Sequence, residues 1–419
     1  MHILIVGSGG REHALAVASA ASPQCTNLSI APGNAGMAEL GTLIDIKAED
    51  IEGLVGFAQE NKVDLVIIGP EVPLVMGLAD QLAKAGIAVF GPSAAAAQLE
   101  GSKSFARDFC SRHHIPQPAF ASFKNAADAK AFVAELGGAC VIKADGLAAG
   151  KGVVVCDNEA DAAVAIDEAL AGAFGAAGEV VLVEERIYGP EISAFALLDG
   201  AKTIWLASAR DHKRAFDGDE GPNTGGMGAI SPSPDETDAL RAEIMEKVIQ
   251  PVAAGMAAEN MPYRGILYAG LMLTDTGPQV IEFNCRFGDP EAEVILPRLN
   301  SDFIDVITGK ISADEMDYNP KTAVTIVLAS KGYPGAYDKG TVIENGLAGL
   351  AALAQETGSA IFHAGTALGS DGQLQAVGGR VLAVTALGDD GKAARQSAYQ
   401  VIDQINWPNG FCRRDIAKI

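Results

Sequence analysis

The stretch Val141 to Val155 reads VIKADGLAAGKGVVV. A short apolar segment ends at Lys143, a glycine-rich loop follows, and Lys151 precedes a second apolar segment. We predict a hairpin of two strands whose glycine loop places mobile backbone N–H groups around a bound phosphate. The alternative interpretation is a flexible surface hairpin that binds nothing.

The commonest phosphate-binding loop does not fit this stretch. The Walker A pattern, GxxxxGK[ST], requires four residues between its glycines and a Ser or Thr after its lysine. Here three residues separate Gly146 from Gly150, and Gly152 follows Lys151. The stretch is therefore a different kind of loop.

The composition is that of a large, acidic, globular protein. The chain has 419 residues, of which 48% are hydrophobic and 20% charged, and 31 basic against 53 acidic side chains give a net charge of -22. This length suggests about three domains. The negative charge argues against binding nucleic acid or an anionic membrane through a broad basic surface, so an anionic ligand needs a local cluster of donors.

The spacing of the cysteines and histidines argues against disulfide bonds and against a zinc site. The six cysteines form no CxxC pair and the six histidines are dispersed, so we expect neither disulfides nor a zinc site. No uncharged apolar run reaches the length of about 18 residues that a membrane helix needs. The first apolar run has five residues, which is short for a signal peptide. We expect a cytoplasmic protein without a membrane segment.

Strand and helix patterns alternate over the first hundred residues. The apolar segments HILIV, LSI, DLVII and IAVF are separated by helical patterns, with helices expected after Arg11, from Asp50 and from Leu74. This alternation is typical of a parallel sheet covered by helices. The pattern breaks near Gly101, where we place the first domain boundary.

The rest of the chain divides into three further regions. The pattern of residues 123–185 predicts a compact unit of three strands and two helices, which is small enough to be a mobile lid. A longer mixed region follows, with a loop over residues 211–234 and a helix from Asp235 to about Asn260. After residue 320 the strand TAVTIVLAS opens the last region.

The turn after the first strand reads GSGGREHA from Gly7. A dinucleotide fingerprint needs a third glycine where Glu12 stands, and no acidic residue closes the second strand, so a nicotinamide oxidoreductase is disfavoured. Backbone amides at Gly9 and Gly10 still meet a helix N-terminus, which suits a phosphate. A tight turn without a ligand is the alternative.

The segment QVIEFNCRFGDPE predicts a metal site. Side chains alternate along a strand, so Glu282 and Asn284 share one face while Ile281 and Phe283 pack behind. One carboxylate and one amide oxygen, completed by water and phosphate, suit Mg²⁺ bound to a nucleotide. Arg286 follows and can neutralise charge on a phosphoryl group. The alternative is an exposed strand face with a salt bridge.

The segment EVVLVEERIYGPEIS places Glu184 and Glu185 at a strand end, where the chain leaves the small unit. A hinge here can offer backbone groups to a purine edge, and Glu191 can accept hydrogen bonds from ribose hydroxyls. A charged strand end without a ligand is the alternative.

Together these motifs resemble the ATP-grasp ligases and, within them, the family of glycinamide ribonucleotide synthetases. The resemblance covers nearly the whole chain in order, and RFGDPE and GPNTGGMGA are specific to that family. The segments that carry it are GSGGREHA, IIGPEVPL, GSKSFARDF, VIKADGLAAGKGVVV, DHKRAFDGDEGPNTGGMGAISP, IEFNCRFGDPE, ASKGYPG and GGRVL.

The resemblance implies an α/β protein with the ATP-grasp fold. Its expected parts are an amino-terminal parallel-sheet α/β domain (1–102), a central catalytic domain (103–122 and 187–320), a small ATP-binding lid (123–186) and a carboxy-terminal mixed α/β domain (321–419). The implied reaction joins glycine to 5-phosphoribosylamine through a glycyl phosphate in de novo purine biosynthesis, and gives glycinamide ribonucleotide, ADP and phosphate. We expect a monomer whose partners are these small molecules.

The resemblance also implies roles for individual residues. ATP contacts are expected from Lys103, Lys143, Gly146, Gly150, Lys151, Gly152, Glu184, Glu185, Ile187 and Glu191. Metal ligands for Mg²⁺ or Mn²⁺ are expected from Glu282 and Asn284, and catalytic roles from Arg286, Lys213 and Asp211. Because ligands of α/β folds bind at strand ends, we expect substrate contacts from Gly9, Gly10, Asn34, Glu71, Asn223, Thr224, Gly225, Gly226, Met227, Asp289, Lys331 and Arg380; each of these could instead be structural.

Two positions depart from the family's pattern. The strand YAGLMLT lacks the further acidic metal ligand of many ATP-grasp enzymes. After RFGDPE the usual pattern is one residue and then Gln or Met, whereas this chain has Ala292 and Glu293, which makes that environment more acidic. Another ATP-grasp carboxylate-amine ligase or carboxylase, and a non-catalytic nucleotide sensor, remain alternatives.

Overall fold

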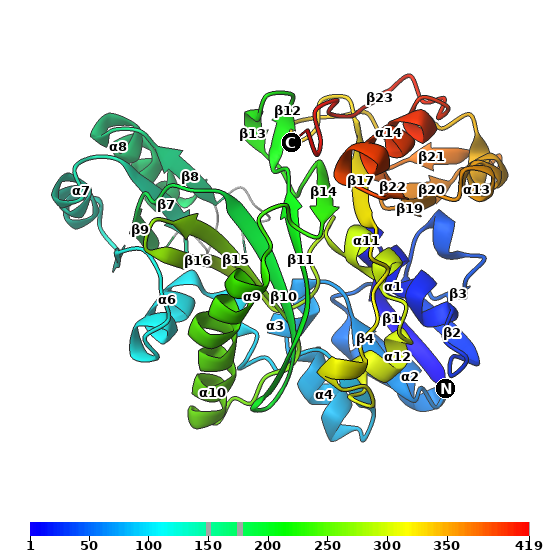
Figure 1. Ribbon diagram of the computed structural model, residues 1–419, viewed down its shortest axis with the longest axis horizontal. Coiled ribbons are helices and arrows are strands. Elements are labelled where there is room, and N and C mark those ends of the chain that lie inside the picture. Colours follow the sequence, from blue (N-terminus) through cyan, green and yellow to red (C-terminus); the bar gives the residue numbers. More distant parts are fainter. Residues whose placement is uncertain (148–151, 174–178, 419) are drawn as a thin grey trace. The chain divides into compact units, whose positions relative to one another are not determined.

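The computed structural model describes residues 1–147, 152–173 and 179–418 (Figure 1). These residues form two compact units, each assembled from segments distant in the sequence. Unit 1 comprises Met1–Gly91, Ile204–Glu236 and Arg286–Ile419, and unit 2 comprises Pro92–Thr203 and Thr237–Cys285. Within the described ranges no helix is long and apolar enough to cross a membrane.

The first sheet of unit 1 is parallel, as the alternating pattern predicted. Its strand order is β3-β2-β1-β4-β5, and every paired strand runs parallel to its neighbour. The strands are β1 (His2–Gly7), β2 (Asn27–Pro32), β3 (Thr42–Leu43), β4 (Leu65–Ile68) and β5 (Ala88–Phe90). The central strand β1 is buried from its second residue onward because helices cover a parallel sheet on both faces.

The helices of this first part connect its strands. They are α1 (Gly10–Ala20), the 3₁₀ turn η1 (Ala35–Met37), α2 (Ile51–Glu60), α3 (Glu71–Val75) and α4 (Leu78–Lys84). Asp50 caps α2 by accepting from the Gly53 N–H group, as the predicted helix start implies. The single helix expected from Leu74 is wrong: Gly77 separates α3 from α4 with a φ of 86°, which a helix interior does not allow.

A second, mostly antiparallel sheet forms the rest of unit 1. Its strands follow the order β11-β14-β17-β22-β19, with β23 paired to β17, and a three-stranded sheet has the order β18-β21-β20. The strands are β11 (Lys202–Asp211, which begins in unit 2), β14 (Gly228–Ser231), β17 (Thr322–Ser330), β18 (Thr341–Val342), β19 (Ala360–His363), β20 (Thr366–Leu368), β21 (Leu374–Ala376), β22 (Arg380–Gly388) and β23 (Gly410–Phe411).

The helices of this part pack on that sheet. Helix α14 contacts β17 and β22, and buried Val324, Leu382 and Val401 belong to the shared core. The helices are α11 (Ala292–Ile295), η5 (Leu296–Arg298), α12 (Phe303–Ile307), η6 (Ala313–Glu315), α13 (Gly346–Thr357) and α14 (Gly391–Ile402).

The loop expected over residues 211–234 contains strands, so that prediction is wrong in part. A hairpin of β12 (Arg214–Phe216) and β13 (Glu220–Asn223) turns at Gly218, whose φ is 75°. Strand β14 follows and is buried along its whole length. The polar, glycine-rich composition concealed the hairpin because its strands are too short to show an alternating pattern.

Unit 2 contains the small sheet of the predicted lid. Its order is β6-β9-β7-β8, with strands β6 (Phe120–Phe123), β7 (Cys140–Ala144), β8 (Val153–Cys156) and β9 (Val181–Glu185). Its helices are α7 (Ala126–Glu135), α8 (Glu159–Glu168) and the π-helical turn η2 (Ala169–Ala173). Asn125 and Asn158 cap α7 and α8, as expected. Strand β6, which was not predicted, pairs with β9.

The rest of unit 2 is an antiparallel sheet with helices. Strands β10 (Glu191–Asp199), β15 (Arg264–Thr274) and β16 (Gly277–Asn284) have the order β16-β15-β10. The helices are α5 (Gln98–Gly101), α6 (Lys103–Arg112), α9 (Asp238–Ile244), η4 (Met245–Ile249) and α10 (Gln250–Ala258). The helix expected from Asp235 begins at Asp238, because Thr237 is its N-cap.

Candidate functional site

The strand that carries the predicted metal ligands contains a β-bulge. Gly270 pairs with Glu282 and Leu271 pairs with Val280, so Ile281 is an extra residue in β16. A bulged residue leaves the hydrogen-bond ladder of its strand pair. The carbonyl group of Ile281 is therefore free to serve contacts outside the sheet.

Two cationic side chains use that carbonyl. Lys143 Nζ donates to the Ile281 oxygen at 2.8 Å, and Arg107 Nη2 donates to it at 2.9 Å. Ile281 is only half-buried, whereas Phe283 is buried. The expectation that Ile281 packs behind the strand is therefore wrong, and the bulge is the reason.

The two expected metal ligands lie beyond the bulge. Glu282 and Asn284 are both half-buried and flank the buried Phe283, as residues on one strand face do. A Cβ atom on Gly270 would lie 3.0 Å from Glu282 Cγ, so the opposing glycine leaves room for this side chain.

Glu282 and Asn284 offer one carboxylate and one amide oxygen. Across the described ranges no group of three or more His, Cys, Asp or Glu side chains is arranged to hold a metal ion. One carboxylate and one amide fit a divalent cation that takes its remaining ligands from phosphate and water.

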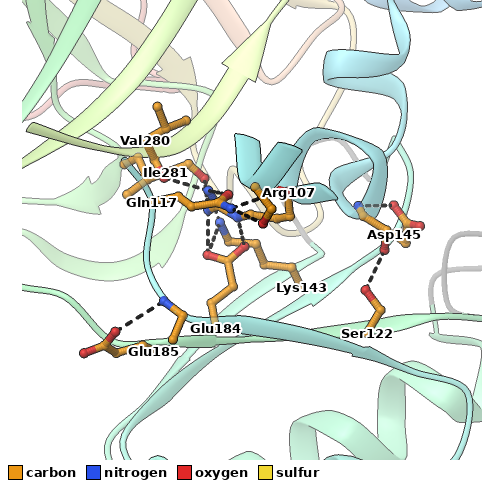
Figure 2. A network of polar contacts seen from close by, with 12 residues as sticks. Arg107, Gln117, Ser122, Lys143, Asp145, Glu184, Glu185, Val280 and Ile281 are labelled. Atoms are coloured by element: carbon orange, nitrogen blue, oxygen red, sulfur yellow. Dashed lines mark hydrogen bonds and ion pairs between the residues drawn. The ribbon is translucent and has the colours of Figure 1, made fainter. Parts of the chain in front are cut away.

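The Glu184 carboxylate lies at the centre of a buried network (Figure 2). Arg107 donates to it twice, from Nε to Oε1 at 2.7 Å and from Nη2 to Oε2 at 2.8 Å. Lys143 Nζ lies 2.8 Å from the same Oε2. All three side chains are at least nine-tenths buried. The network thus holds two cationic side chains around one carboxylate, and the Glu282 carboxylate also acts on Lys143.

The charges of this network oppose the effect of burial. Burial acts to raise the pKa of Glu184, but Lys143 and Arg107 outweigh it and hold that pKa below its ordinary value. Burial lowers the pKa of Lys143, although Glu184 opposes the shift. Glu184 is therefore a carboxylate at neutral pH, and it holds the Lys143 ammonium group in place.

Arg107 was not among the predicted site residues. It lies on α6 four residues after Lys103, a spacing that puts both side chains on one helix face. Besides Glu184 and Ile281 it contacts the carbonyl of Val280 at 2.7 Å. The signal was present in GSKSFARDF, where Lys and Arg are separated by one helical turn.

Glu184 and its neighbours were expected at an adenine-side hinge. The backbone of Glu184 pairs with Phe120 on one side and Val141 on the other, so it lies inside the small sheet. The Glu185 N–H group donates to Ala119, and its side chain is exposed. Beyond the strand end lie half-buried Ile187 and Glu191. The hinge role of these residues stays a prediction.

The glycine-rich loop is anchored at its start. Lys103 Nζ donates to the Gly146 carbonyl at 2.8 Å. The Asp145 carboxylate accepts from Ser102 Oγ and from the Ser104 N–H group, both at 3.1 Å. These contacts join the first turn of α6 to the loop, and the φ of 137° at Gly146 requires a glycine.

The far side of this loop is described only in part. Gly150 and Lys151 lie outside the described residues, and Gly152 accepts at its carbonyl from the Ala144 N–H group at 2.8 Å. Burial lowers the pKa of Lys103, and the Glu282 carboxylate opposes this shift most strongly.

In unit 1, the Gly9-Gly10 turn begins helix α1. The Glu12 carboxylate accepts from the Gly9 N–H group at 2.6 Å and pairs with Arg11 Nε at 2.5 Å. A Cβ atom on Gly69 would collide with the Glu12 side chain. Glu12, which excludes the dinucleotide fingerprint, is therefore the residue that closes the turn.

Asn34 fixes the other side of this turn. Its amide donates to the carbonyl of Ser8 at 2.9 Å and to that of His363 at 2.7 Å, and Gly36 donates to its side-chain oxygen. Its side chain is buried. The structure thus places Asn34 at the turn, where its side chain holds the backbone, and its expected contact with the substrate stays a prediction.

Arg380 connects the RFGDPE segment to the GPNTGGMGA segment. Its Nη2 lies 3.0 Å from Asp289 Oδ1, and its Nη1 donates to the carbonyls of Gly225 at 2.6 Å and Asp289 at 2.7 Å. A Cβ atom on Gly9 would lie 3.1 Å from Asp289 Oδ2. Four predicted substrate residues therefore meet at the turn: Gly9, Gly225, Asp289 and Arg380.

Glu71 and Arg286 form a second pair in unit 1. Arg286 Nε lies 3.4 Å from Glu71 Oε2, at the first residue of α3. Burial acts to raise the pKa of Glu71, but Arg286 and Arg11 outweigh it and lower that pKa. The structure therefore brings together two predicted residues and keeps Glu71 ionised.

The GPNTGGMGA segment is ordered by its own contacts. The Thr224 N–H and hydroxyl groups both donate to the Lys213 carbonyl at 2.8 Å, and Gly226 donates to the Thr224 hydroxyl at 2.9 Å. Asn223 ends β13 opposite Arg214. These contacts fix the shape of the segment around Thr224.

Three predicted residues have structural surroundings. Met227 is fully buried in the core of the second sheet of unit 1, so its side chain is not accessible. Lys331 Nζ donates to the Pro408 carbonyl at 2.7 Å, and Lys213 Nζ lies 4.0 Å from Asp211 Oδ2. Their roles in substrate binding or catalysis stay predictions.

Comparisons with known proteins match three family models. These are described as the phosphoribosylglycinamide synthetase N domain (residues 1–100), ATP-grasp (A) domain (residues 101–292) and C domain (residues 323–419). A curated relative from Agrobacterium fabrum, named phosphoribosylamine-glycine ligase, is 52% identical over 99% of this chain and 98% of its own. A relative of the same name from Vibrio cholerae is 49% identical over 99% and 97%.

Solved structures give the same result. The phosphoribosylamine-glycine ligase of Thermotoga maritima is 32% identical, covers 99% of this chain and 100% of its own, and superposes with a TM-score of 0.84. The biotin carboxylase domain of Hydrogenobacter thermophilus 2-oxoglutarate carboxylase, in complex with MgADP and bicarbonate, is 17% identical with a TM-score of 0.73 over 98% of this chain and 91% of its own. The second likeness concerns the fold alone.

Proposed function

The chain belongs to the phosphoribosylglycinamide synthetase family, and on this premise we propose how its residues carry out the family's reaction. It is a ligase with the ATP-grasp fold that uses ATP to join glycine to phosphoribosylamine in purine biosynthesis. The observation that carries this function is the match to relatives of that name over the full chain at about 50% identity. The family uses ATP and a divalent metal.

Unit 2 holds the nucleotide in this account. Lys103 and Lys143 bind the phosphates, with the loop from Gly146 to Gly152 over them. The network of Arg107, Glu184 and Lys143 supports this role because it holds the Lys143 ammonium group in a fixed position. We assign Glu184, Glu185 and Ile187 to the adenine side of the nucleotide and Glu191 to its ribose.

Glu282 and Asn284 are the ligands of Mg²⁺ or Mn²⁺ in this account. Their oxygen atoms, the half-buried strand face and the glycine opposite Glu282 support this role. These two residues would hold a divalent cation, which would supply positive charge against the phosphate oxygens during the transfer.

The reaction requires activation of a carboxylate. A carboxylate resists attack by an amine because it is anionic and has no good leaving group. A glycine oxygen attacks the γ-phosphorus of ATP, the bond to the ADP oxygen breaks, and glycyl phosphate forms. The amine nitrogen of phosphoribosylamine then attacks the carbonyl carbon, phosphate leaves with the transferred oxygen, and the nitrogen loses a proton.

The chain's residues contribute position and charge to these steps. Arg286 neutralises the carboxylate or its phosphate, and its pair with ionised Glu71 supports that position. Exclusion of water protects the acyl phosphate from hydrolysis. Lys213 and Asp211 are further catalytic candidates.

The Gly9-Gly10 turn binds the phosphate of phosphoribosylamine in this account. The backbone N–H groups of a helix N-terminus favour an anion, and Asn34, Asp289 and Arg380 shape the turn. We assign Glu71, Lys331 and the segment from Asn223 to Met227 to the same substrate set. The protein acts as a cytoplasmic monomer, with the domain division expected from the sequence.

A substrate-dependence assay tests this function. ADP release from ATP should require both glycine and phosphoribosylamine, with formation of the amide product. Release of ADP with bicarbonate or formate in place of glycine, and none with glycine, would identify a different ATP-grasp activity.

A further inference from the structure

Glu293 is a buried acid that forms no ion pair with the residues that the structure describes. It lies on α11, its side chain is almost wholly inaccessible, and its Oε2 atom has no hydrogen-bond partner among the residues that the structure describes. A Cβ atom on Gly10 would collide with Glu293 Oε1. The carboxyl group therefore lies directly against the first residue of α1.

Two other carboxylates surround the same turn, and each has a cation. Glu12 pairs with Arg11 at 2.5 Å, and Asp289 pairs with Arg380 at 3.0 Å. The charges within each of these pairs cancel. Glu293 is the carboxyl group that lies directly against Gly10, so its charge state acts on the turn at the closest range.

We propose that Glu293 is a positioning residue for the phosphate of phosphoribosylamine: it stays a neutral carboxylic acid against Gly10 and so keeps the turn free of net negative charge. This inference rests on the proposed role of the Gly9-Gly10 turn. The N-terminus of α1 attracts an anion through its N–H groups. A carboxylate in contact with Gly10 would oppose that attraction, and a neutral acid does not.

The surroundings of Glu293 favour the neutral form. Burial raises its pKa well above the ordinary value, and Asp289 raises it further, while Arg380 opposes them. Strands β14 and β17, which pack against α11, contain no ionisable residue. The other elements that pack against α11 and the segment before it present these ionisable or charged groups: Arg11, Glu12, His13, Asp289, Glu291, Arg298 and Arg380.

A neutral Glu293 resembles an amide side chain. A protonated glutamic acid has nearly the shape of glutamine and, like it, carries no charge, with one donor and remaining acceptor capacity. Burial is what retains the proton of Glu293.

Proton release on unfolding tests the charge state. In the unfolded chain Glu293 ionises near its ordinary pKa of about 4.3, so unfolding at pH 7.5 should release one proton more from the wild type than from Glu293→Gln. The pH dependence of the urea unfolding free energy gives this difference. Glu356→Gln, which removes an exposed carboxylate on α13, is the matched control and should behave as the wild type does. Equal proton release by wild type and Glu293→Gln would overturn the proposal.

Ligand binding tests the positioning role. Ribose 5-phosphate serves as the probe from pH 7 to 9.5, where a phosphate whose second pKa is about 6 keeps its charge. Glu293→Gln and Glu293→Met should bind it within about twofold of the wild type at pH 7.5 and keep that affinity to pH 9.5. Affinity of the wild type and of Glu356→Gln for the probe should fall toward pH 9.5, relative to Glu293→Gln, as Glu293 ionises and its charge opposes the bound phosphate.

The outcomes separate this inference from the proposed function. Suppose that the wild type forms glycinamide ribonucleotide, and that its affinity for ribose 5-phosphate depends on pH in the same way as that of Glu293→Gln. The inference about Glu293 then fails, and the proposed function stands. A loss of probe affinity above tenfold in Glu293→Gln at pH 7.5 also overturns it, because an uncharged isostere should suffice. Failure of the wild type to ligate glycine at any pH is instead the failure of the proposed function.

Discussion

Arg107 and Glu184 form a buried, two-pronged ion pair, with hydrogen bonds of 2.7 and 2.8 Å from one guanidinium to both carboxylate oxygens. A planar guanidinium matches a carboxylate in this way, and the match fixes the orientation of the acid. Lys143 uses the same carboxylate and the carbonyl of the bulged Ile281. The lysine that we assign to phosphate binding is therefore held in place by Glu184 and by the Ile281 carbonyl.

Replacing Lys143 should affect ATP binding more than folding. In Lys143→Ala the Glu184 carboxylate keeps its Arg107 partner, so no buried charge is left unpaired. The lost hydrogen bond to a charged phosphate corresponds to about 1.5–3 kcal/mol, or roughly a tenfold to hundredfold weaker dissociation constant for ATP. Isothermal titration and urea unfolding measure the two effects separately.

Lys130→Ala is the matched control for this change. Lys130 lies on helix α7, which belongs to the same small lid region as Lys143, and it pairs with Asp167 at the surface. Its removal should leave ATP affinity unchanged. An equal loss of unfolding free energy and of ATP binding free energy in Lys143→Ala would refute the role of Lys143 in phosphate binding.

Removing Arg107 should destabilise unit 2. In Arg107→Met the buried Glu184 keeps one cation, and the Val280 and Ile281 carbonyls lose a donor. Because a buried acceptor left without its donor costs about 1–3 kcal/mol, we expect a loss of at least that size in the free energy of unfolding. Urea unfolding measures it, with Arg112→Met as control because that exposed arginine on the same helix should cost about 1 kcal/mol or less.

A double-mutant cycle identifies the pair itself. Adding Glu184→Gln to Arg107→Met should cost less than the sum of the two single changes, by about 0.5–3 kcal/mol, because the partners no longer leave each other unpaired. Additive losses would mean that the two side chains stabilise unit 2 independently.

The fold was largely predictable because its signals are local. Alternating apolar strands and helical patterns gave the parallel sheet, and Asn125 and Asn158 marked two helix starts through their capping. The β12–β13 hairpin could not be found in this way. Its strands are three and four residues long and carry polar side chains, so no periodicity distinguishes them from a loop.

The site residues that we proposed from the sequence are those that stand in a recognisable motif. Lys143 and Glu282 stand in recognisable patterns, whereas Arg107 and Glu293 take their importance from contacts far along the chain. Arg107 meets Glu184, 77 residues away, and Glu293 meets Gly10 only in the folded unit. The bulge at Ile281 likewise depends on pairing with β15, which alternation within one strand does not reveal.

Changing a metal ligand should raise the metal requirement. Glu282→Gln keeps the shape of the side chain but removes its charge, so a divalent cation loses a carboxylate ligand. We expect the Mg²⁺ or Mn²⁺ concentration for half-maximal ADP formation to rise by about tenfold or more. Asp275→Asn, in the exposed turn between β15 and β16, is the control. An unchanged metal requirement in Glu282→Gln would remove Glu282 from the metal site.

Acid should destabilise unit 1 through His13 and His363. The backbone N–H group of His363 donates to His13 Nδ1 at 2.8 Å, and both rings are buried. Burial, and for His13 also the nearby His363, lowers their pKa values to about 3 and about 4. Both histidines are therefore neutral in the folded protein. Below a pH of about 6.5 they take up protons in the unfolded chain but not yet in the folded protein.

Stability should therefore fall with pH from about 6.5 down to these folded pKa values. Each histidine contributes about 1.4 kcal/mol per pH unit within that window. His13→Gln keeps an acceptor for the His363 N–H group but does not titrate, so its unfolding free energy should decline less steeply between pH 6 and 5. Identical slopes for His13→Gln and wild type would exclude His13 as the group that takes up the proton.

The central claim is that glycine is activated by phosphorylation of its carboxylate. Glycine labelled with ¹⁸O in both carboxylate oxygens tests it most directly, by mass spectrometry of the inorganic phosphate and of the amide product. Because a glycine oxygen becomes the bridge to phosphorus and leaves with it, each amide formed should be accompanied by one phosphate that carries one ¹⁸O atom. Phosphate without ¹⁸O, formed together with the amide, would contradict the glycyl phosphate route.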